Sequence, residues 1–328
     1  MNIMKERIVS GVQPSGEMHV GNYLGALKDF VNLQNDYDCY FFIADLHSIT
    51  EDYKAADKSE QILNTLASFL AVGIDPEKST VFIQSHIPAH SELAWIFNTI
   101  TPIGELERMT QYKDKAARQK ANINMGLLDY PVLQAADILL YKPAFVPVGR
   151  DQLQHLELTN TIAKKFNNKF GEEFTLIKPF MKTPIRVMSL VDPEKKMSKS
   201  DPASVINIFD EPAEIKKKLA KAVTATGTSI EQMPAGVRNL FDLLEQFGQK
   251  DDYQQLKKQY HDGKIKYSEL KSTLADAISE YFKPMREARE KLLANPKALE
   301  KIYETGAAKA AELANKTLKE VKKRVGLI

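Results

Sequence analysis

The sequence predicts an α/β fold in which a Rossmann-like, doubly wound parallel sheet carries an appended all-helical domain. The first reason is that short apolar runs alternate with segments of helical periodicity between Arg7 and Phe166, which is typical of parallel strands covered by helices on both faces. The second is that apolar residues recur only at helical spacing from Glu211 onward. The third is that 328 residues, 43% of them apolar, suffice for a sizeable core and one or two domains.

The first strand is predicted at residues 7–10, and a turn-rich loop leads from it into a helix that opens at residues 19–22. Residues 39–44 form a continuous apolar run, which is typical of a strand buried on both faces. The same patterns predict the other elements of this region as a helix at 59–73, a strand at 80–84, a helix at 92–100, a strand at 145–148 and a helix at 152–166.

Residues 104–128 are rich in charged side chains and are predicted to form a helical insertion. Pro131 is expected to begin the helix that follows, because proline is tolerated in a first helical turn. Further helices are predicted at 211–224, 237–248, 251–262, 266–291 and 296–326. We expect a Rossmann-like domain at residues 1–204, a helical domain at 205–291 and a C-terminal helix at 292–328 that packs back on the first domain.

Composition excludes several classes of protein. The net charge of +2 creates no global attraction for nucleic acid, so such a partner needs a local basic patch. The single cysteine, Cys39, excludes an internal disulfide and a cysteine-built metal site. The N-terminus has no apolar signal segment, and no run is long and apolar enough to cross a bilayer. We therefore expect a soluble protein of a reducing compartment, with no membrane partner.

The segment Lys-Lys-Met-Ser-Lys-Ser at residues 195–200 is the strongest indication of function. It lies between Pro193 and Asp201-Pro202, which disfavours a regular element. A loop with three lysines and two serines in six residues suits a polyanion such as a nucleoside triphosphate. The alternative is a solvated surface loop.

A second loop, residues 11–22, favours the same ligand. It leads into a helix start, where free N–H groups and the helix dipole favour phosphate. His19 can donate a hydrogen bond to phosphate, although alone it would be an ordinary surface histidine, and Gly21 permits close approach of a ribose or phosphate. Ligands of open α/β sheets lie beyond the carboxyl ends of the strands. We therefore expect this loop, residues 45–50, residues 149–152 and the lysine-rich loop to meet.

Residues 14–22, Pro-Ser-Gly-Glu-Met-His-Val-Gly-Asn, resemble the first signature of class I aminoacyl-tRNA synthetases, and residues 196–200 are identical to the second. Within that class the chain resembles the tryptophanyl-tRNA synthetases over essentially its whole length, notably at residues 104–111, 135–141 and 187–190. The resemblance implies a cytoplasmic homodimer that uses ATP to join tryptophan to tRNA(Trp). It also implies that Mg²⁺ is carried on ATP, without a dedicated protein metal site.

The resemblance also implies roles for individual residues. His19, Lys196 and Lys199 would be catalytic. The nucleotide would be bound by Gln13, Pro14, Ser15, Gly21, Asn22, Gly149, Arg150, Asp151, Val187, Lys196, Met197, Ser198, Lys199 and Ser200. Tryptophan would be bound by Gln13, His47, Tyr130, Asp137 and Gln152. Residues 1–204 would be catalytic and residues 205–291 would bind the anticodon, with lysines at 216, 217, 218 and 221 either meeting phosphates or forming a solvated face.

Asp137 stands out from the residues alone. On a helix from Pro131 it shares a face with Ala136 and Leu140, so a carboxylate lies in an apolar stripe. Such a group is costly unless it is paired. Asp137 would pair with a core arginine, cap another element, or accept the indole N–H of tryptophan, which is a donor only.

The sequence departs from the family pattern at three positions: His19 replaces a usual threonine, Arg150 a usual glutamate, and Gln134 a common methionine. Three alternatives remain: a tyrosyl-tRNA synthetase, a smaller nucleotidyltransferase that shares the first signature, and a non-catalytic RNA-binding regulator derived from a synthetase. The helix around Asp137 disfavours the first, and the lysine-rich loop and helical tail disfavour the second. The intact signatures disfavour the third. The apolar stretch at residues 95–97 is the sequence support for a dimer interface.

Overall fold

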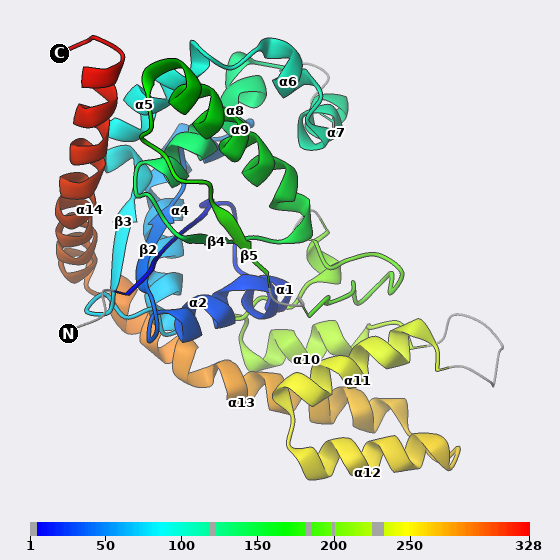
Figure 1. The fold of residues 1–328 in the computed structure, drawn as a ribbon. Coiled ribbons are helices and arrows are strands. Elements are labelled where there is room, and N and C mark those ends of the chain that lie inside the picture. Colours follow the sequence, from blue (N-terminus) through cyan, green and yellow to red (C-terminus); the bar gives the residue numbers. More distant parts are fainter. Residues whose placement is uncertain (1–4, 119–122, 182–184, 199–200, 225–232) are drawn as a thin grey trace.

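The computed structural model describes residues 5–118, 123–181, 185–198, 201–224 and 233–328 (Figure 1). Within them, the centre is a five-stranded sheet of β1 (Arg7–Val12), β2 (Asp38–Ile43), β3 (Ser79–Ile83), β4 (Phe145–Pro147) and β5 (Lys178–Phe180). Neighbouring strands are parallel and their order is β3-β2-β1-β4-β5. This is the predicted doubly wound arrangement, in which the winding reverses between β1 and β4.

The central strands bury both faces, as their apolar runs predict. Ile8, Phe41 and Val81 belong to one hydrophobic cluster, while their chain neighbours Val9 and Phe42 belong to a second cluster. Because successive side chains of a strand point to opposite faces, the two clusters are the two layers of core on either side of the sheet.

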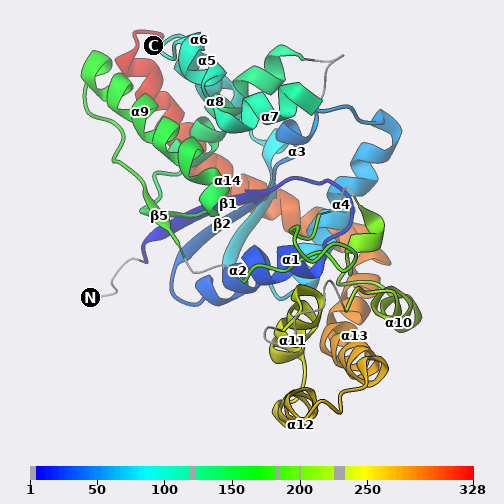
Figure 2. The ribbon, with the colours of Figure 1, turned by 90° about the vertical axis from the view of Figure 1, so that its right-hand side faces the viewer.

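Helices cover both layers (Figure 2). One layer contains residues of α1 (Val20–Asn22), the π-helical turn Tyr23–Leu27, α2 (Lys28–Leu33) and α4 (Ala55–Ala71). The other contains residues of α5 (Ala89–Asn98), α8 (Met125–Leu139), α9 (Leu153–Phe170) and α14 (Pro296–Arg324). Short helices at the carboxyl ends of strands and in the insertion are α3 (Asp45–Ser48), α6 (Ile103–Glu107) and α7 (Thr110–Arg118).

From Pro212 onward the described elements are all helices, as predicted from Glu211 onward. They are α10 (Pro212–Ala220), α11 (Ala235–Phe247), α12 (Lys250–His261) and α13 (Tyr267–Leu293), followed by α14. Helix α13 contacts both α10 and α4, so one long helix joins the helical part to the sheet part (Figure 1). Helix α14 then runs back along β3 and α5. No described helix has the length and apolar character needed to cross a bilayer.

Two details of the predicted elements are corrected. Pro131 does not begin a helix but lies inside α8, because Asn124 caps the start of that helix by accepting a hydrogen bond from the Leu127 N–H at 2.9 Å. The helix therefore starts a turn and more before the proline, at the cost of one backbone hydrogen bond. The structure also contains β5, which the sequence did not predict; it is a three-residue strand at the end of the sheet order, and its Pro179 is tolerated at an edge.

Gly306 allows α14 to touch β3. A Cβ at this position would overlap the carbonyl oxygen of Val81. We expect Gly306→Ala to lower the free energy of unfolding by about 3 kcal/mol, because the helix must move away from the strand. Urea denaturation measures this effect. The matched control is Gly25→Ala, where nothing lies within 4 Å of the added Cβ; equal losses in the two variants would contradict the prediction.

Candidate active site

A cavity of about 430 Å³ lies beyond the carboxyl ends of β1 and β4, where the strand order reverses. All five residues predicted to bind the amino acid line it: Gln13, His47, Tyr130, Asp137 and Gln152. They come from the loop after β1, from α3, from α8 and from the turn after β4. The apolar part of the wall includes Phe42, Ile138 and Val146.

Asp137 is 1% exposed and is held by three donors. Its Oδ2 accepts a hydrogen bond from His47 Nε2 at 2.7 Å. Its Oδ1 accepts hydrogen bonds from Gln84 Nε2 at 2.7 Å and from His90 Nδ1 at 2.6 Å. The sequence had left open that Asp137 pairs with a core arginine or caps another element. In the structure, two histidines and a glutamine take that place. The acid is therefore paired, as burial requires.

The carboxyl group of Asp137 is ionised at neutral pH. Burial acts to raise its pKa, but the charge and hydrogen bond of His47 and the hydrogen bond and charge of His90 lower the pKa to about 2. An ionised carboxylate offers about four acceptor positions and no donor. Oδ1 accepts two described donors and Oδ2 accepts one. One acceptor position on Oδ2 is therefore left, on a group that lines the cavity.

Three polar residues of this region were missed in the sequence analysis: Gln84, His90 and Gln111. Gln84 directly follows the apolar run of β3, and His90 lies on the buried face of α5 with Leu93. Both signals were available, since a polar residue in an apolar stripe is what singled out Asp137. Gln111 lines the cavity and donates to the carbonyl oxygen of Asp151 at 3.1 Å, so α7 covers one side of the pocket.

The first signature forms the capped start of α1. The Nδ1 of His19 accepts a hydrogen bond from the Asn22 N–H at 3.3 Å, and the Asn22 side chain accepts one from the His19 N–H at 3.1 Å. A Cβ at Gly21 would lie 2.9 Å from the His19 ring, so this glycine makes room for the imidazole. His19 lies at the helix start, as predicted, but it is buried and not an ordinary surface histidine.

Backbone pairing joins the first signature to the chain that follows the second. Val20 N–H donates to the Ile206 carbonyl and Ile208 N–H donates to the Met18 carbonyl, both at 2.9 Å. Within the lysine-rich loop, Met197 N–H donates to the carbonyl of Val187 at 3.0 Å, and Val187 lies 3.8 Å from where a Cβ of Gly21 would be. The described part of the second signature is therefore joined to the first through Val187 and through residues 206 and 208.

The side chains of the lysine-rich loop differ in how far they are exposed to solvent. Met197 is buried, and Val187 lies 3.8 Å from the Cβ position of Gly21. Lys196 and Ser198 are exposed. Lys199 and Ser200 lie outside the described residues. Lys195, which precedes the signature, pairs with Asp192 at 2.8 Å.

The turn after β4 carries Gly149, Arg150, Asp151 and Gln152 at the mouth of the cavity. Asp151 and Gln152 line the cavity, and Gln152 accepts a hydrogen bond from Gln134 Nε2 at 3.3 Å. Arg150 is exposed and is not among the residues that line the cavity.

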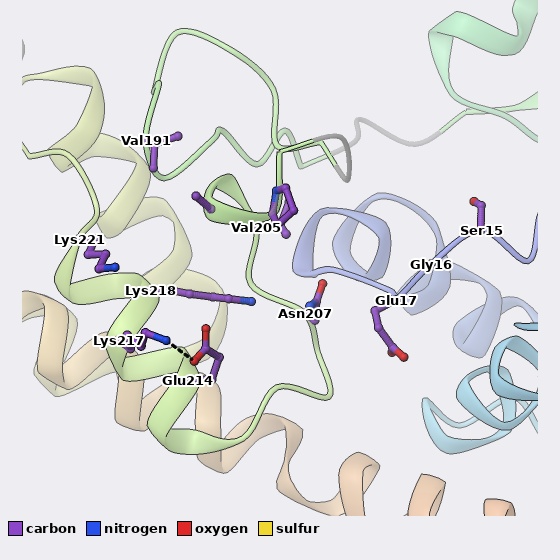
Figure 3. Close-up of a pocket in the computed structure, with 12 residues that line it drawn as sticks. Ser15, Gly16, Glu17, Val191, Val205, Asn207, Glu214, Lys217, Lys218 and Lys221 are labelled. Carbon is purple, nitrogen blue, oxygen red and sulfur yellow. Dashed lines mark hydrogen bonds and ion pairs between the residues drawn. The ribbon is translucent and has the colours of Figure 1, made fainter. Parts of the chain in front are cut away.

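A second cavity, of about 820 Å³, borders the first loop and is shown in Figure 3. It is bounded by Ser15–Glu17, by residues 202–207, by α10, which contributes Lys217 and Lys218, and by Lys221 directly after that helix. Lys218 pairs with Asp210 at 2.6 Å and Lys217 pairs with Glu214 at 3.3 Å. Two of its three lysines are thus already neutralised by acids.

The doubly wound sheet and the two signatures joined beside its crevice define a class I aminoacyl-tRNA synthetase. Residues 3–283 match the family described as tRNA synthetases class I (W and Y). The chain therefore belongs to this family.

Individual relatives are similar over nearly the full length. The chain is 47% identical to a tryptophan–tRNA ligase of Clostridium perfringens, over 100% of this chain and 99% of that protein. It is 44% identical to a tryptophan–tRNA ligase of Clostridium tetani, over 99% and 96%. A crystal structure of tryptophanyl-tRNA synthetase from Campylobacter jejuni, complexed with ADP and tryptophan, has a TM-score of 0.88 and 36% identity, covering 98% of this chain and 99% of that chain.

Proposed function

We propose that the chain is a bacterial-type tryptophan–tRNA ligase, an enzyme that activates tryptophan with ATP and transfers it to the 3′ end of tRNA(Trp). The observation that carries this function is the buried Asp137 carboxylate, which keeps one acceptor position at a cavity with an apolar wall. The indole N–H is a donor only, so it complements that position. Full-length relatives with this activity support the same conclusion.

The reaction has two steps. A carboxylate oxygen of tryptophan attacks the α-phosphorus of ATP, the bond to the bridging oxygen breaks, and pyrophosphate leaves with that electron pair. A ribose hydroxyl of the terminal tRNA adenosine then attacks the carbonyl carbon and AMP leaves. The attacking carboxylate is already ionised at neutral pH, so the first step requires alignment and charge neutralisation rather than a general base.

We assign the charge neutralisation to Lys196 and Lys199, with help from His19 and from Mg²⁺ carried on ATP. Support comes from the pairing that holds the chain on both sides of Asn207 against the first signature. The exposed Lys196 is then a cation on a loop anchored by the buried Met197. A loop of this kind is suited to close over a triphosphate.

We propose that the nucleotide lies along the two joined signatures and the turn after β4. Its binding residues would be Gln13, Pro14, Ser15, Gly21, Asn22, Gly149, Arg150, Asp151, Val187, Met197, Ser198 and Ser200, together with the two lysines. Tryptophan would lie in the 430 Å³ cavity, against Gln13, His47, Tyr130, Asp137 and Gln152. The Asp151 and Gln13 side chains border that cavity, so the two ligands would meet there.

We further propose that residues 1–204 form the catalytic domain and that residues 205–291 bind the anticodon arm. Lysines 217 and 218 on α10 and Lys221 directly after it line the second cavity, where phosphates would compete with Glu214 and Asp210 for the first two. Because tRNA is an intracellular substrate, we place the enzyme in the cytoplasm.

Charging of tRNA tests the function as a whole. In vitro transcribed tRNA(Trp), ATP, Mg²⁺ and labelled tryptophan should yield tryptophanyl-tRNA, whereas a tRNA(Tyr) transcript with labelled tyrosine should yield no product. Charging of tRNA(Tyr) would instead support the tyrosyl alternative. Binding of tRNA(Trp) without charging would support the non-catalytic regulator.

We propose a homodimer on the basis of exposed apolar side chains. Trp95, on α5, is 72% exposed, and Ile103 and Met125, at the starts of α6 and α8, are 61% and 70% exposed. Helices α5 and α6 both pack against α8. Large apolar side chains gathered on adjoining elements are typical of an interface.

Trp95→Glu is expected to convert the dimer into a monomer, because a charge would be buried without a partner in the interface. Sedimentation velocity measures the mass of the particle. Met181→Glu is the control and should leave the mass unchanged. Met181 is 45% exposed and directly follows β5, at one edge of the sheet. Trp95 lies on α5, which contacts α14, the helix that runs along β3 at the opposite edge. A monomeric unmodified protein would contradict the proposal.

A further inference from the structure

Behind Asp137, His90 and Tyr141 form a buried hydrogen-bond chain that ends at its carboxylate; neither of the two lines the cavity. His47 and Asp137 line the 430 Å³ cavity, but Gln84 and His90 do not, and both are 0% exposed. His90 Nδ1 lies 2.6 Å from Asp137 Oδ1, and His90 Nε2 lies 2.8 Å from the Tyr141 hydroxyl. The chain Tyr141–His90–Asp137 thus runs from the core to the cavity wall.

Both ring nitrogens of His90 have a hydrogen-bond partner. The ionised Asp137 only accepts hydrogen bonds, so Nδ1 of the imidazole carries a proton and donates it to Oδ1. Burial, followed by the charge of Asp137, raises the pKa of Tyr141, so its hydroxyl keeps its proton beside Nε2. The ring of His90 is therefore held at both ends.

The surroundings of His90 give it no other polar use. The rings of Phe42, Phe82 and Tyr141 lie 5.9, 6.1 and 5.6 Å from its ring. Burying a polar side chain among such rings is costly unless its polar atoms are hydrogen-bonded. The one charged partner of His90 is Asp137. His90 and Gln84 together occupy Oδ1 of that carboxylate.

We propose that His90 is a positioning residue for amino-acid selection, which holds Oδ1 of Asp137 so that the open acceptor position of Oδ2 faces the indole N–H. The inference rests on the proposed function, since it requires tryptophan in this cavity. His90 does not touch the substrate in this account. It acts by setting the rotation of the carboxylate, while Tyr141 holds the other nitrogen of the imidazole.

A selection role is separable from a general role in packing. The readout is the ratio of kcat/KM for tryptophan to kcat/KM for 3-benzothienylalanine, in which sulfur replaces the indole N–H with little change in shape. Loss of packing lowers both values and leaves the ratio unchanged. Loss of the positioned acceptor lowers only the value for tryptophan, and so lowers the ratio.

Two variants of His90 form a matched pair. In His90→Asn the amide nitrogen can take the place of Nδ1 and still donate to Asp137. In His90→Gln the amide lies nearer the place of Nε2, and the donor to Asp137 is lost. Pyrophosphate exchange measures the ratio for both, and thermal unfolding shows that each variant is folded.

We expect His90→Gln to lower the ratio by about 10- to 100-fold, the equivalent of one hydrogen bond to a charged group. The change should lie mainly in KM for tryptophan, with KM for ATP unchanged. His90→Asn should stay within about threefold of the unmodified protein, as a rescue by the donor at Nδ1. Should His90→Gln not fold, Tyr141→Phe serves instead and should lower the ratio by a smaller factor, because His90 still donates to Asp137 but loses the hydrogen bond that holds its other ring nitrogen.

An unchanged ratio in His90→Gln, or equal losses in His90→Gln and His90→Asn, would overturn the inference while leaving the proposed function intact. Absence of discrimination by the unmodified protein would overturn the assignment of Asp137 to the indole N–H, and this inference with it. The two failures are distinguished because the second appears before any substitution is made.

Discussion

Asp137→Asn is expected to lower kcat/KM for tryptophan in pyrophosphate exchange by about 10³-fold or more. The amide oxygen is expected to stay with the two donors Gln84 and His90, which places the amide nitrogen, a donor, beside His47 and where the indole N–H needs an acceptor. Buried donors that face one another are costly, so the carboxylate network is broken as well as neutralised. Most of the loss should appear in KM for tryptophan.

The control for this variant is Asp129→Asn on the same helix. Asp129 is half-buried, its pKa is raised by burial, and its Oδ2 accepts a hydrogen bond from Asn98 at 2.9 Å. An asparagine there can accept the same hydrogen bond, and Asp129 does not line the cavity. We expect activity close to that of the unmodified protein. Equal losses at the two positions would mean that charge on α8, rather than the indole acceptor, controls activity.

Lys196→Ala is expected to lower kcat of pyrophosphate exchange by about 10²- to 10³-fold, the effect of removing one group that stabilises charge in a transition state. KM for tryptophan should change little, because Lys196 does not line the tryptophan cavity. This division between kcat and KM is the reverse of that expected for Asp137→Asn. Steady-state kinetics of the two variants therefore separate the two halves of the site.

Lys195→Ala is the matched control, since it removes the neighbouring lysine of the same loop. The side chain of Lys195 is 80% exposed and pairs with Asp192 at 2.8 Å. Exposed pairs of this kind contribute little. We expect kcat to stay within about twofold of the unmodified value. A loss as large as that of Lys196→Ala would show that the loop needs positive charge in general, and not a lysine at residue 196.

The sequence predicts the sheet and most helices because hydrophobic periodicity follows directly from burial. The continuous run at residues 39–44 fills both core layers, and an acid in an apolar stripe led to Asp137. The predicted start of α8 was wrong. Proline is favoured in a first helical turn, but Asn124, which lies earlier in the chain, caps this helix. Local patterns rank such signals poorly when tertiary packing holds the helix together.

The partners of Asp137 could not be predicted, because they are brought to it by the fold. His90 and Gln84 are 47 and 53 residues away in sequence and reach the carboxylate from α5 and from the end of β3. Pairing of residues 206 and 208 with the first signature is likewise a tertiary contact without a local pattern. The sequence therefore indicated five residues that line one cavity, but not the hydrogen bonds that orient them.

The central claim is that this cavity selects tryptophan and that the two joined signatures activate it with ATP. Amino-acid-dependent exchange of labelled pyrophosphate into ATP by the unmodified protein tests both parts at once. The account predicts exchange with tryptophan and none above background with tyrosine. Exchange with tyrosine at a comparable rate, or no exchange with either amino acid, would contradict it.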